Sequence, residues 1–183
     1  MFYTYPMSHI HTDPGQHDLT ACAYIVRMDL PEPALLLHRH RKLNKWLQFG
    51  GHVELDENLW QAVLREIREE SGYEPAQLKL LQPDIPLIPL SRAVSHPWPV
   101  NINTHRFGAL DHYHNDIAYA FTASQDPRHK EGDGESAMFR SFERDALAAL
   151  TDGEIPANVR ETGLMILDYY LKSWRQVDLP ETD

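Results

Sequence analysis

The chain has 183 residues, a formal net charge of −10 at pH 7 and one cysteine, Cys22. This length suits one domain with a substantial core, and a single cysteine excludes an intrachain disulfide. The acidic balance argues against a surface that binds nucleic acid or an anionic membrane, but a bound cation can still supply the charge that a small phosphorylated ligand requires.

The first sixteen residues are polar and rich in turn formers, so we expect an N-terminal arm over residues 1–16 and a single domain over residues 17–183. The opening segment lacks the basic and apolar regions of a signal peptide. No run approaches the ~18 apolar residues of a membrane span. We therefore expect a cytoplasmic protein with no membrane partner.

Two apolar segments near the start predict a β-hairpin. Residues 19–28 are apolar and β-branched enough for a buried strand, in which Cys22 serves as a small core residue. A proline-containing turn over residues 29–33 separates this strand from a second one over residues 34–40.

Residues 57–71 show the periodicity of a helix. Asp56 is the expected N-cap, Leu55 and Trp60 could form a hydrophobic staple across it, and Gly72 suits the position after the helix. Apolar residues recur at helical spacing and form one stripe, which consists of Leu59, Trp60, Val63, Leu64 and Ile67.

The rest of the chain alternates irregularly between strand and helix patterns. Prolines between residues 75 and 99 exclude a long helix there. Strands are expected over residues 116–123 and 138–142, with a charged loop over 125–136 between them. Helices are expected over residues 143–150 and 158–175. This order predicts an α/β fold with a mixed sheet and helices on its faces.

Three carboxylates cluster on the helix predicted over residues 57–71. Glu66, Glu69 and Glu70 stand at i, i+3 and i+4 and cover an arc of about 100° beside the apolar stripe. Like charges at this spacing repel by ~0.2–0.5 kcal/mol per pair, and a hard cation such as Mg²⁺ would reverse that cost. From the helix alone, a solvated acidic face is the more common arrangement.

The residues around this cluster change the interpretation. Residues 51–73 read GHVELDENLWQAVLREIREESGY, which resembles the Nudix box. The matching positions are Gly51, Glu57, Arg65, Glu66, Ile67, Glu69, Glu70 and Gly72. Tyr73 departs mildly from the usual aliphatic residue, and Phe49 stands where the family often has proline. The resemblance extends over about residues 17–150.

The resemblance implies a Nudix α/β/α sandwich and a hydrolase that uses Mg²⁺ or Mn²⁺. Metal ligands would be Glu66, Glu69 and Glu70, with the Gly51 carbonyl as a further ligand. Glu57 would pair with Arg65 and fix the loop against the helix, and Gly50-Gly51 would let the backbone approach metal and phosphate closely. Water would attack a phosphorus of a diphosphate linkage.

The base that deprotonates this water stays open. Glu69 or Glu66 is the expected base, while some relatives use an acidic residue outside the box. The candidates for that second role here are Asp116, Glu131 and Glu135.

The expected substrate is a small nucleoside diphosphate derivative and not a nucleic acid polymer. The box does not choose among nucleoside triphosphates, sugar nucleotides, dinucleoside polyphosphates and dinucleotide cofactors, because it contacts the diphosphate and metal that all share. One alternative is a ligand-binding regulatory module that has lost catalysis, against which the intact carboxylate set argues. A prenyl diphosphate isomerase ranks low, because no cysteine-plus-glutamate pair is evident.

Several residues outside the box are candidates for substrate contacts. Arg39 and Arg41 belong to a basic cluster with Lys42 and Lys45, which could contact phosphates or simply be solvated. Trp46 could stack on a base or anchor the core.

Eleven histidines are present, and pairs at i, i+2 share a face when they lie in a strand. Such pairs are His38 with His40 and His112 with His114. Polar surface positions are the most common arrangement for such residues, but His114 and Asp116 are candidates for lining the substrate pocket, and a zinc site formed with His112 is a further alternative. A homodimer stays open, because the C-terminal helix could serve an interface or the core.

Overall fold

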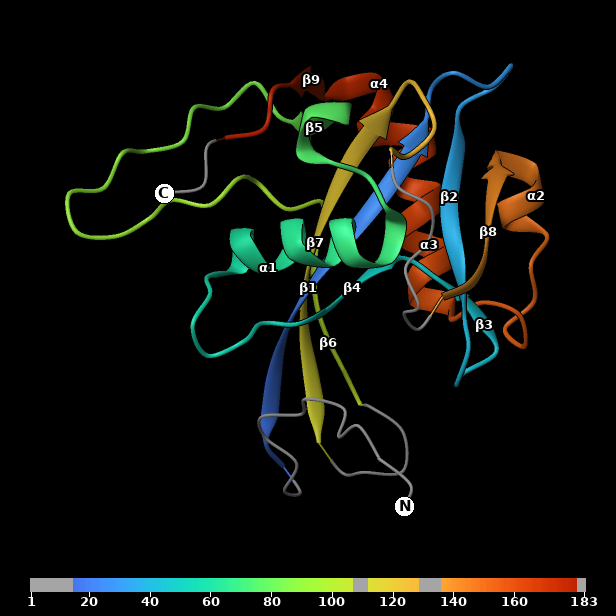
Figure 1. Cartoon of the computed structure of the whole chain (residues 1–183), viewed down its shortest axis with the longest axis horizontal. Coiled ribbons are helices and arrows are strands. Elements are labelled where there is room, and N and C mark those ends of the chain that lie inside the picture. Colours follow the sequence, from blue (N-terminus) through green and yellow to red (C-terminus); the bar gives the residue numbers. More distant parts are fainter. Residues whose placement is uncertain (1–14, 107–111, 129–135, 181–183) are drawn as a thin grey trace.

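A computed structural model describes residues 15–106, 112–128 and 136–180 (Figure 1). At its centre lie two parallel strands, β1 (His17–Arg27) and β7 (Tyr113–Ala123), which pair along eleven consecutive positions. Within the described residues, the main path of the mixed sheet runs β3-β2-β1-β7-β5-β9. The remaining strands are β2 (Ala34–His40), β3 (Lys45–Leu47), β4 (Phe49–His52), β5 (Leu78–Gln82), β6 (Asn101–Arg106), β8 (Ser136–Glu143) and β9 (Arg175–Val177).

Both central strands change neighbours half-way along their length. The second half of β1 pairs with β2, whereas residues 20–23 pair with β4. In the same way, the second half of β7 pairs with β5 and its first half pairs with β6. The starts of β1 and β7 are therefore flanked by β4 and β6, and these four strands share one end of the sheet (Figure 1).

The acidic helix covers one face of the sheet. It comprises α1 (Leu59–Glu66) and a π-helical turn, η1 (Ile67–Ser71), and it ends at Gly72 in the left-handed conformation with φ 72°. Its apolar stripe joins a core cluster with β1 and β7, which contains Trp60 stacked on Phe121. The predicted stripe and the C-terminal glycine are both present.

The predicted start of this helix is wrong by two residues. Asn58, and not Asp56, is the N-cap, because its Oδ1 accepts hydrogen bonds from the Trp60 and Gln61 amides while the Gln61 side chain accepts one from the Asn58 amide. This reciprocal capping box satisfies several amide groups at once. Leu55 is 88% exposed, so the expected staple does not form.

The second half of the helix is also not the regular α-helix that the spacing argument assumed. From Ile67 to Ser71 the chain forms a wider π-turn, in which the Ser71 hydroxyl donates a hydrogen bond to the Ile67 carbonyl. Single π-turns inside helices occur often at functional sites. The angular spacing of Glu69 and Glu70 therefore departs from 100° per residue.

The opposite face of the sheet is covered by the C-terminal helices. They are α3 (Ala157–Met165), η3 (Ile166–Tyr170) and α4 (Leu171–Ser173), and the buried side chains of α3 and η3 pack against β1 and β2. Gly163 permits this approach, because a Cβ there would lie 2.6 Å from Leu35 Cδ2. The prediction of a C-terminal helix is confirmed, and its apolar side serves the core. The short α2 (Arg144–Ala148) follows β8.

The fold class agrees with the prediction of a mixed sheet between helices, but five of the nine strands in the described residues were not predicted: β3, β4, β5, β6 and β9. β6 occupies residues 101–106, whose alternating exposure follows an edge-like polar sequence, NINTHR, that carries little apolar signal. A 3₁₀ turn, η2 (Pro75–Gln77), precedes β5 in the proline-rich region. Nearly all of the expected N-terminal arm, as well as Glu131 and Glu135, lies outside the described residues. None of the helices within the described ranges has the length and apolar character needed to cross a membrane.

Candidate active site

Arg65 is the centre of an ion-pair network at the start of the acidic helix. Its guanidinium binds Glu57 through both carboxylate oxygens, with Nη2–Oε1 at 2.8 Å and Nε–Oε2 at 3.1 Å. Nη1 also donates to Glu66 Oε1 at 2.8 Å and to Glu69 Oε2 at 3.1 Å. Nη2 reaches the His52 carbonyl at 3.1 Å, so one side chain ties the loop and the strand to the helix. The expected pair between Glu57 and Arg65 is present.

Two glycines of β4 contact the carboxylates of the acidic helix. The Gly50 amide donates a hydrogen bond of 2.9 Å to Glu70 Oε2. A side chain on Gly50 would collide with the Ala21 carbonyl, and its φ of 139° is one that other residues rarely adopt. Likewise, a Cβ on Gly51 would collide with the Glu66 carboxylate. The two glycines therefore let the backbone lie directly against both carboxylates.

The three box glutamates differ in environment. The Glu66 side chain is 13% exposed and the Glu69 side chain is 60% exposed. Burial raises the pKa of Glu66 above its usual value, although the neighbouring Arg65 opposes this. Burial also acts to raise the pKa of Glu57, but the hydrogen bonds from Arg65 and the Glu54 amide outweigh it and lower that pKa. Glu57 is thus held as the charged partner of Arg65.

This donor set fits a hard divalent cation. The carboxylates of Glu66 and Glu70 lie directly against the backbone of Gly50 and Gly51, where they can offer oxygen ligands. Glu69 adds a third carboxylate that is accessible to solvent. Mg²⁺ prefers oxygen ligands, uses few protein carboxylates and retains water or phosphate oxygens in its other positions. A cation would also relieve the repulsion among carboxylates that share one arginine.

The expected substrate residues of β2 and β3 lie elsewhere. Trp46 is 7% exposed and contacts Phe142 edge-on at 5.1 Å, in the core cluster on the opposite face from the acidic helix. Arg39 lies over the Trp46 ring at 5.5 Å and donates a hydrogen bond to Asn44. Arg41 is exposed in the turn that follows β2. Trp46 therefore serves as a core anchor, and its ring faces are not turned to the box.

His114 and Asp116 lie on β7, which is separated from β4 by β1 alone, and their side chains are on the face of the sheet opposite the acidic helix. Both are buried, with exposed fractions of 6% and 7%. Asp116 accepts a short hydrogen bond from Thr20 and lies 3.3 Å from His105 Nδ1. Burial acts to raise the pKa of Asp116, but the contacts with His105 and Thr20 outweigh burial, lower this pKa and keep the carboxylate charged.

The structure brings further residues to this place that the sequence analysis did not single out. They are Asp18 of β1, His52 of β4 and His105 of β6. The expected zinc set of His112, His114 and Asp116 is replaced by two groups that share His114. Asp18 and His52 form one group with it, and His105 and Asp116 form the other. Strand pairing, which is invisible in a single sequence, brings these residues together.

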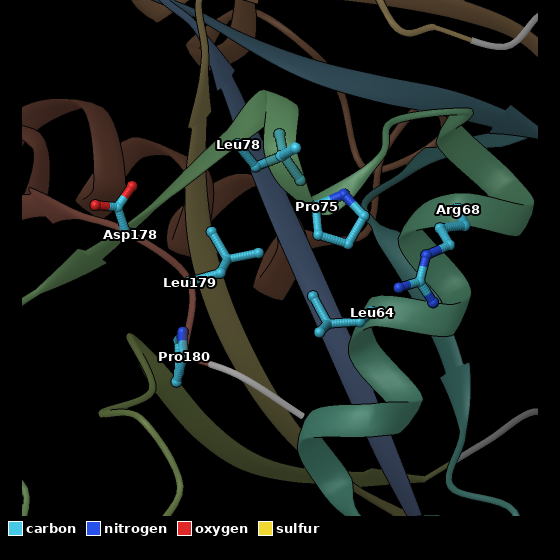
Figure 2. Close-up of a pocket in the computed structure, with 8 residues that line it drawn as sticks. Leu64, Arg68, Pro75, Leu78, Asp178, Leu179 and Pro180 are labelled. Carbon is cyan, nitrogen blue, oxygen red and sulfur yellow. The ribbon is translucent and has the colours of Figure 1, made fainter. Parts of the chain in front are cut away.

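A surface pocket of about 310 Å³ lies on another side of the acidic helix. Figure 2 shows it between Leu64 and Arg68 of that helix, Pro75 and the C-terminal segment at Leu179. None of the residues that the sequence analysis assigned to metal or substrate lines this pocket. The carboxylate network, and not this hollow, marks the candidate site.

The comparisons with known proteins agree with the geometry. A model of the NUDIX domain matches residues 16–161, which is well over half of the chain. The chain belongs to the Nudix family. The human m7GpppN-mRNA hydrolase NUDT17 is 34% identical over 125 residues, or 66% of this chain. The match covers 34% of that relative, so this Nudix chain spans about a third of the length of the curated protein it matches.

Solved Nudix structures show the same fold. A Nudix hydrolase from Clostridium perfringens has a TM-score of 0.62 at 24% identity, covering 82% of this chain and 96% of that one. An Ap4A hydrolase from C. elegans has a TM-score of 0.60 at 18% identity, covering 85% of this chain and 98% of that one. At these identities the likeness establishes the fold and leaves the substrate open.

Proposed function

We propose that this protein is a divalent-metal-dependent pyrophosphohydrolase that cleaves a phosphoanhydride bond in a small nucleoside diphosphate derivative. One observation carries the proposal: the box carboxylates of Glu66 and Glu70 converge on the side-chain-free backbone of Gly50-Gly51. A regulatory module that merely kept the fold would have no need for this arrangement.

The position of each residue in the site suggests its role. Glu66 and Glu70, together with the Gly51 carbonyl, would hold Mg²⁺ or Mn²⁺. When bound, such an ion neutralises charge that develops on the phosphates and lowers the pKa of coordinated water. Arg65 is a positioning residue, because it holds the Glu66 carboxylate while it is itself held by Glu57.

Glu69 is the proposed base. It is the exposed member of the box carboxylates, with 60% of its side chain accessible, so water and substrate can reach it. Its link to Arg65 fixes the direction of the carboxylate without burying it. A base must lie within hydrogen-bond reach of the proton that it removes, and exposure toward the substrate side favours Glu69 over the buried Glu66.

The nature of the substrate is supported by the family and by its named members, which include an Ap4A hydrolase, an ADP-ribose pyrophosphatase and a UDP-X diphosphatase. The substrates in these names all contain a nucleoside linked to two or more phosphates. The bound metal would supply the positive charge that an acidic chain of net charge −10 lacks for binding such a ligand.

The test is a substrate panel with Mg²⁺ and Mn²⁺, covering ADP-ribose, Ap4A, a UDP-sugar, a capped dinucleotide and nucleoside triphosphates. Products are separated by chromatography, and ¹⁸O-water identifies the phosphorus that is attacked. We expect hydrolysis of at least one compound by the wild type. Loss of a metal-holding or base carboxylate should reduce kcat on the order of 100-fold or more in both Glu69→Gln and Glu70→Gln.

Glu161→Gln is the matched control, because Glu161 is an exposed glutamate of α3 on the other face of the sheet. It should retain full activity. Absence of hydrolysis across the panel would contradict the enzymatic proposal. Activity that survives both box substitutions would contradict the assignment of the site.

A further inference from the structure

A second group of potential metal ligands lies at the shared end of β1, β4, β6 and β7. Strand register explains how it forms: Asp18 pairs with His114, and His114 pairs with His105. Thr20 of β1 in turn pairs with both His52 and Asp116. Directly paired residues point to the same face of a sheet, so four strands deliver these side chains to one place.

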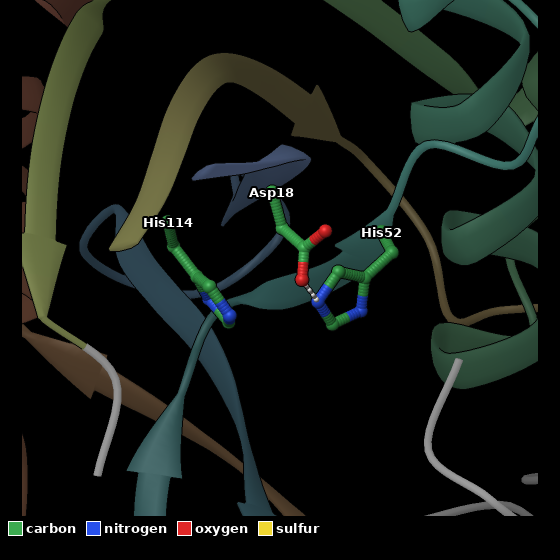
Figure 3. A group of neighbouring side chains, drawn as sticks. All are labelled: Asp18, His52 and His114. Carbon is green, nitrogen blue, oxygen red and sulfur yellow. Dashed lines mark ion pairs between the residues drawn. The ribbon is translucent and has the colours of Figure 1, made fainter. Parts of the chain in front are cut away.

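The distances within one part of this cluster match a metal site. Asp18 Oδ2 lies 3.5 Å from His52 Nε2, and the ligand atoms of Asp18, His52 and His114 all lie within 4.8 Å of one another (Figure 3). His112 Nε2 lies 3.9 Å from the same Asp18 oxygen. Bonds of about 2.0–2.1 Å in a tetrahedral zinc site separate neighbouring ligand atoms by roughly 3.3 Å. Small side-chain rotations would bring these atoms to that spacing.

The electrostatic setting also suits a transition metal. Asp18 is 1% exposed and His112 is fully buried, so a carboxylate is held deep among imidazoles. His114 is also buried, with an exposed fraction of 6%. A neutral imidazole offers the lone pair that a metal requires, and a divalent cation would stabilise the buried carboxylate.

We propose that Asp18, His52 and His114 bind a transition metal ion of the Zn²⁺ class, with water in the remaining position. Nitrogen-rich sites with one carboxylate select Zn²⁺ and its neighbours, whereas Mg²⁺ prefers oxygen ligands. The site is distinct from the Nudix-box site, because none of the box glutamates contributes to it. It would tie the start of β1 to β4 and β7.

The adjacent group of His105 and Asp116 is not part of the proposed ligand set. Asp116 is already bonded to Thr20 and in contact with His105, while its carboxylate lies within 4.8 Å of a ligand atom of His114. The Asp116 carboxylate is thus engaged by Thr20 and His105, and we do not assign it as a ligand of the proposed ion.

The first test measures zinc directly in the full chain. Protein stripped with EDTA is equilibrated with Zn²⁺, freed of excess metal and analysed by mass spectrometry, in parallel with Co²⁺ substitution and visible absorption spectra. We expect one tightly held ion and the absorption bands of four-coordinate Co²⁺. At Zn²⁺ about 100-fold above Kd, the melting temperature should rise by roughly 5–10 °C.

Substitutions assign the ligands. Asp18→Asn and His52→Gln should each abolish the zinc-dependent rise in melting temperature, whereas Glu70→Gln of the box should retain it. His40→Gln, at the C-terminal end of β2 and outside both ligand groups, is the matched histidine control and should behave as the wild type. Melting temperatures in EDTA show whether each variant folds.

The opposite pattern would overturn the proposal. Zinc lost in Glu70→Gln but retained in Asp18→Asn would place the ion on the box carboxylates. Retention in Asp18→Asn with loss in Asp116→Asn would place it in the adjacent group. X-ray absorption of the wild-type zinc protein serves if the variants do not fold: two or more imidazole ligands are expected, and a purely oxygen shell contradicts the site.

Discussion

Arg65 offers the sharpest test of how the site is built. Its guanidinium makes hydrogen bonds to three carboxylates and to the His52 carbonyl, and its side chain is 28% exposed. Replacement by alanine leaves Glu57 and Glu66, which are 12% and 13% exposed, without this counter-charge. Breaking a fully buried pair costs about 3–5 kcal/mol, so partial exposure reduces the expected loss to about 2–3 kcal/mol.

The prediction is measured by thermal unfolding. For a chain of this size, 1 kcal/mol corresponds to about 2–4 °C, so Arg65→Ala should lower the melting temperature by roughly 4–12 °C in EDTA. Arg65→Lys keeps the charge but loses the forked geometry, so it should lower the melting temperature by about half as much as Arg65→Ala. Saturating Mg²⁺ should narrow the gap between wild type and Arg65→Ala, because the ion supplies part of the missing positive charge.

The control is Arg144→Ala. Arg144 also binds a carboxylate, Asp168, but both side chains are largely accessible at 52% and 44%. Its loss should leave the melting temperature unchanged within error, since exposed pairs contribute little. The reasoning is refuted if Arg65→Ala melts within 1 °C of the wild type in EDTA, or if Mg²⁺ widens the gap instead of narrowing it.

Three further predictions concern single positions. In Gly51→Ala, the new Cβ displaces the Glu66 carboxylate, so Mn²⁺ affinity measured by electron paramagnetic resonance should fall on the order of 10-fold or more while the fold is retained. Asn58→Ala removes the helix cap and should cost about 1 kcal/mol in denaturant unfolding, whereas Asp56→Ala should cost nothing measurable. Burial raises the pKa of the Cys22 thiol, so a thiol reagent at pH 8 should react with the unfolded chain and not with the native one.

The acidic helix shows what can be predicted from a sequence. Its apolar stripe, its glutamates and Gly72 all lie within a few turns of one another, so local periodicity is sufficient to place them. The errors in the predicted start and geometry of this helix arise where side chains compete for the same backbone hydrogen bonds. Asn58 and Gln61 bond reciprocally and displace Asp56 as the cap, and the π-turn appears where the Ser71 hydroxyl bonds back to Ile67.

The histidine cluster shows where sequence reasoning stops. His112 and His114 are recognisable as a pair, but their surroundings depend on which strands lie beside β7. Asp18 lies 96 positions before His114 in the sequence, but the two residues are paired in the sheet. Neither the parallel pairing of β1 with β7 nor the polar strand β6 leaves a periodic signal that would identify these neighbours.

The two proposed metal sites involve adjacent residues of β4, Gly51 and His52. Gly51 pairs with Ala21 and faces the acidic helix, whereas His52 pairs with Thr20 and contacts His114 on the other face. Successive residues of a strand point to opposite faces, so a single backbone segment belongs to both sites. Arg65 reinforces the link, because it binds the His52 carbonyl and the box carboxylates together. An ion at the histidine cluster would therefore fix the backbone that carries the Gly51 carbonyl, and its removal should weaken Mn²⁺ binding at the box without changing any ligand there.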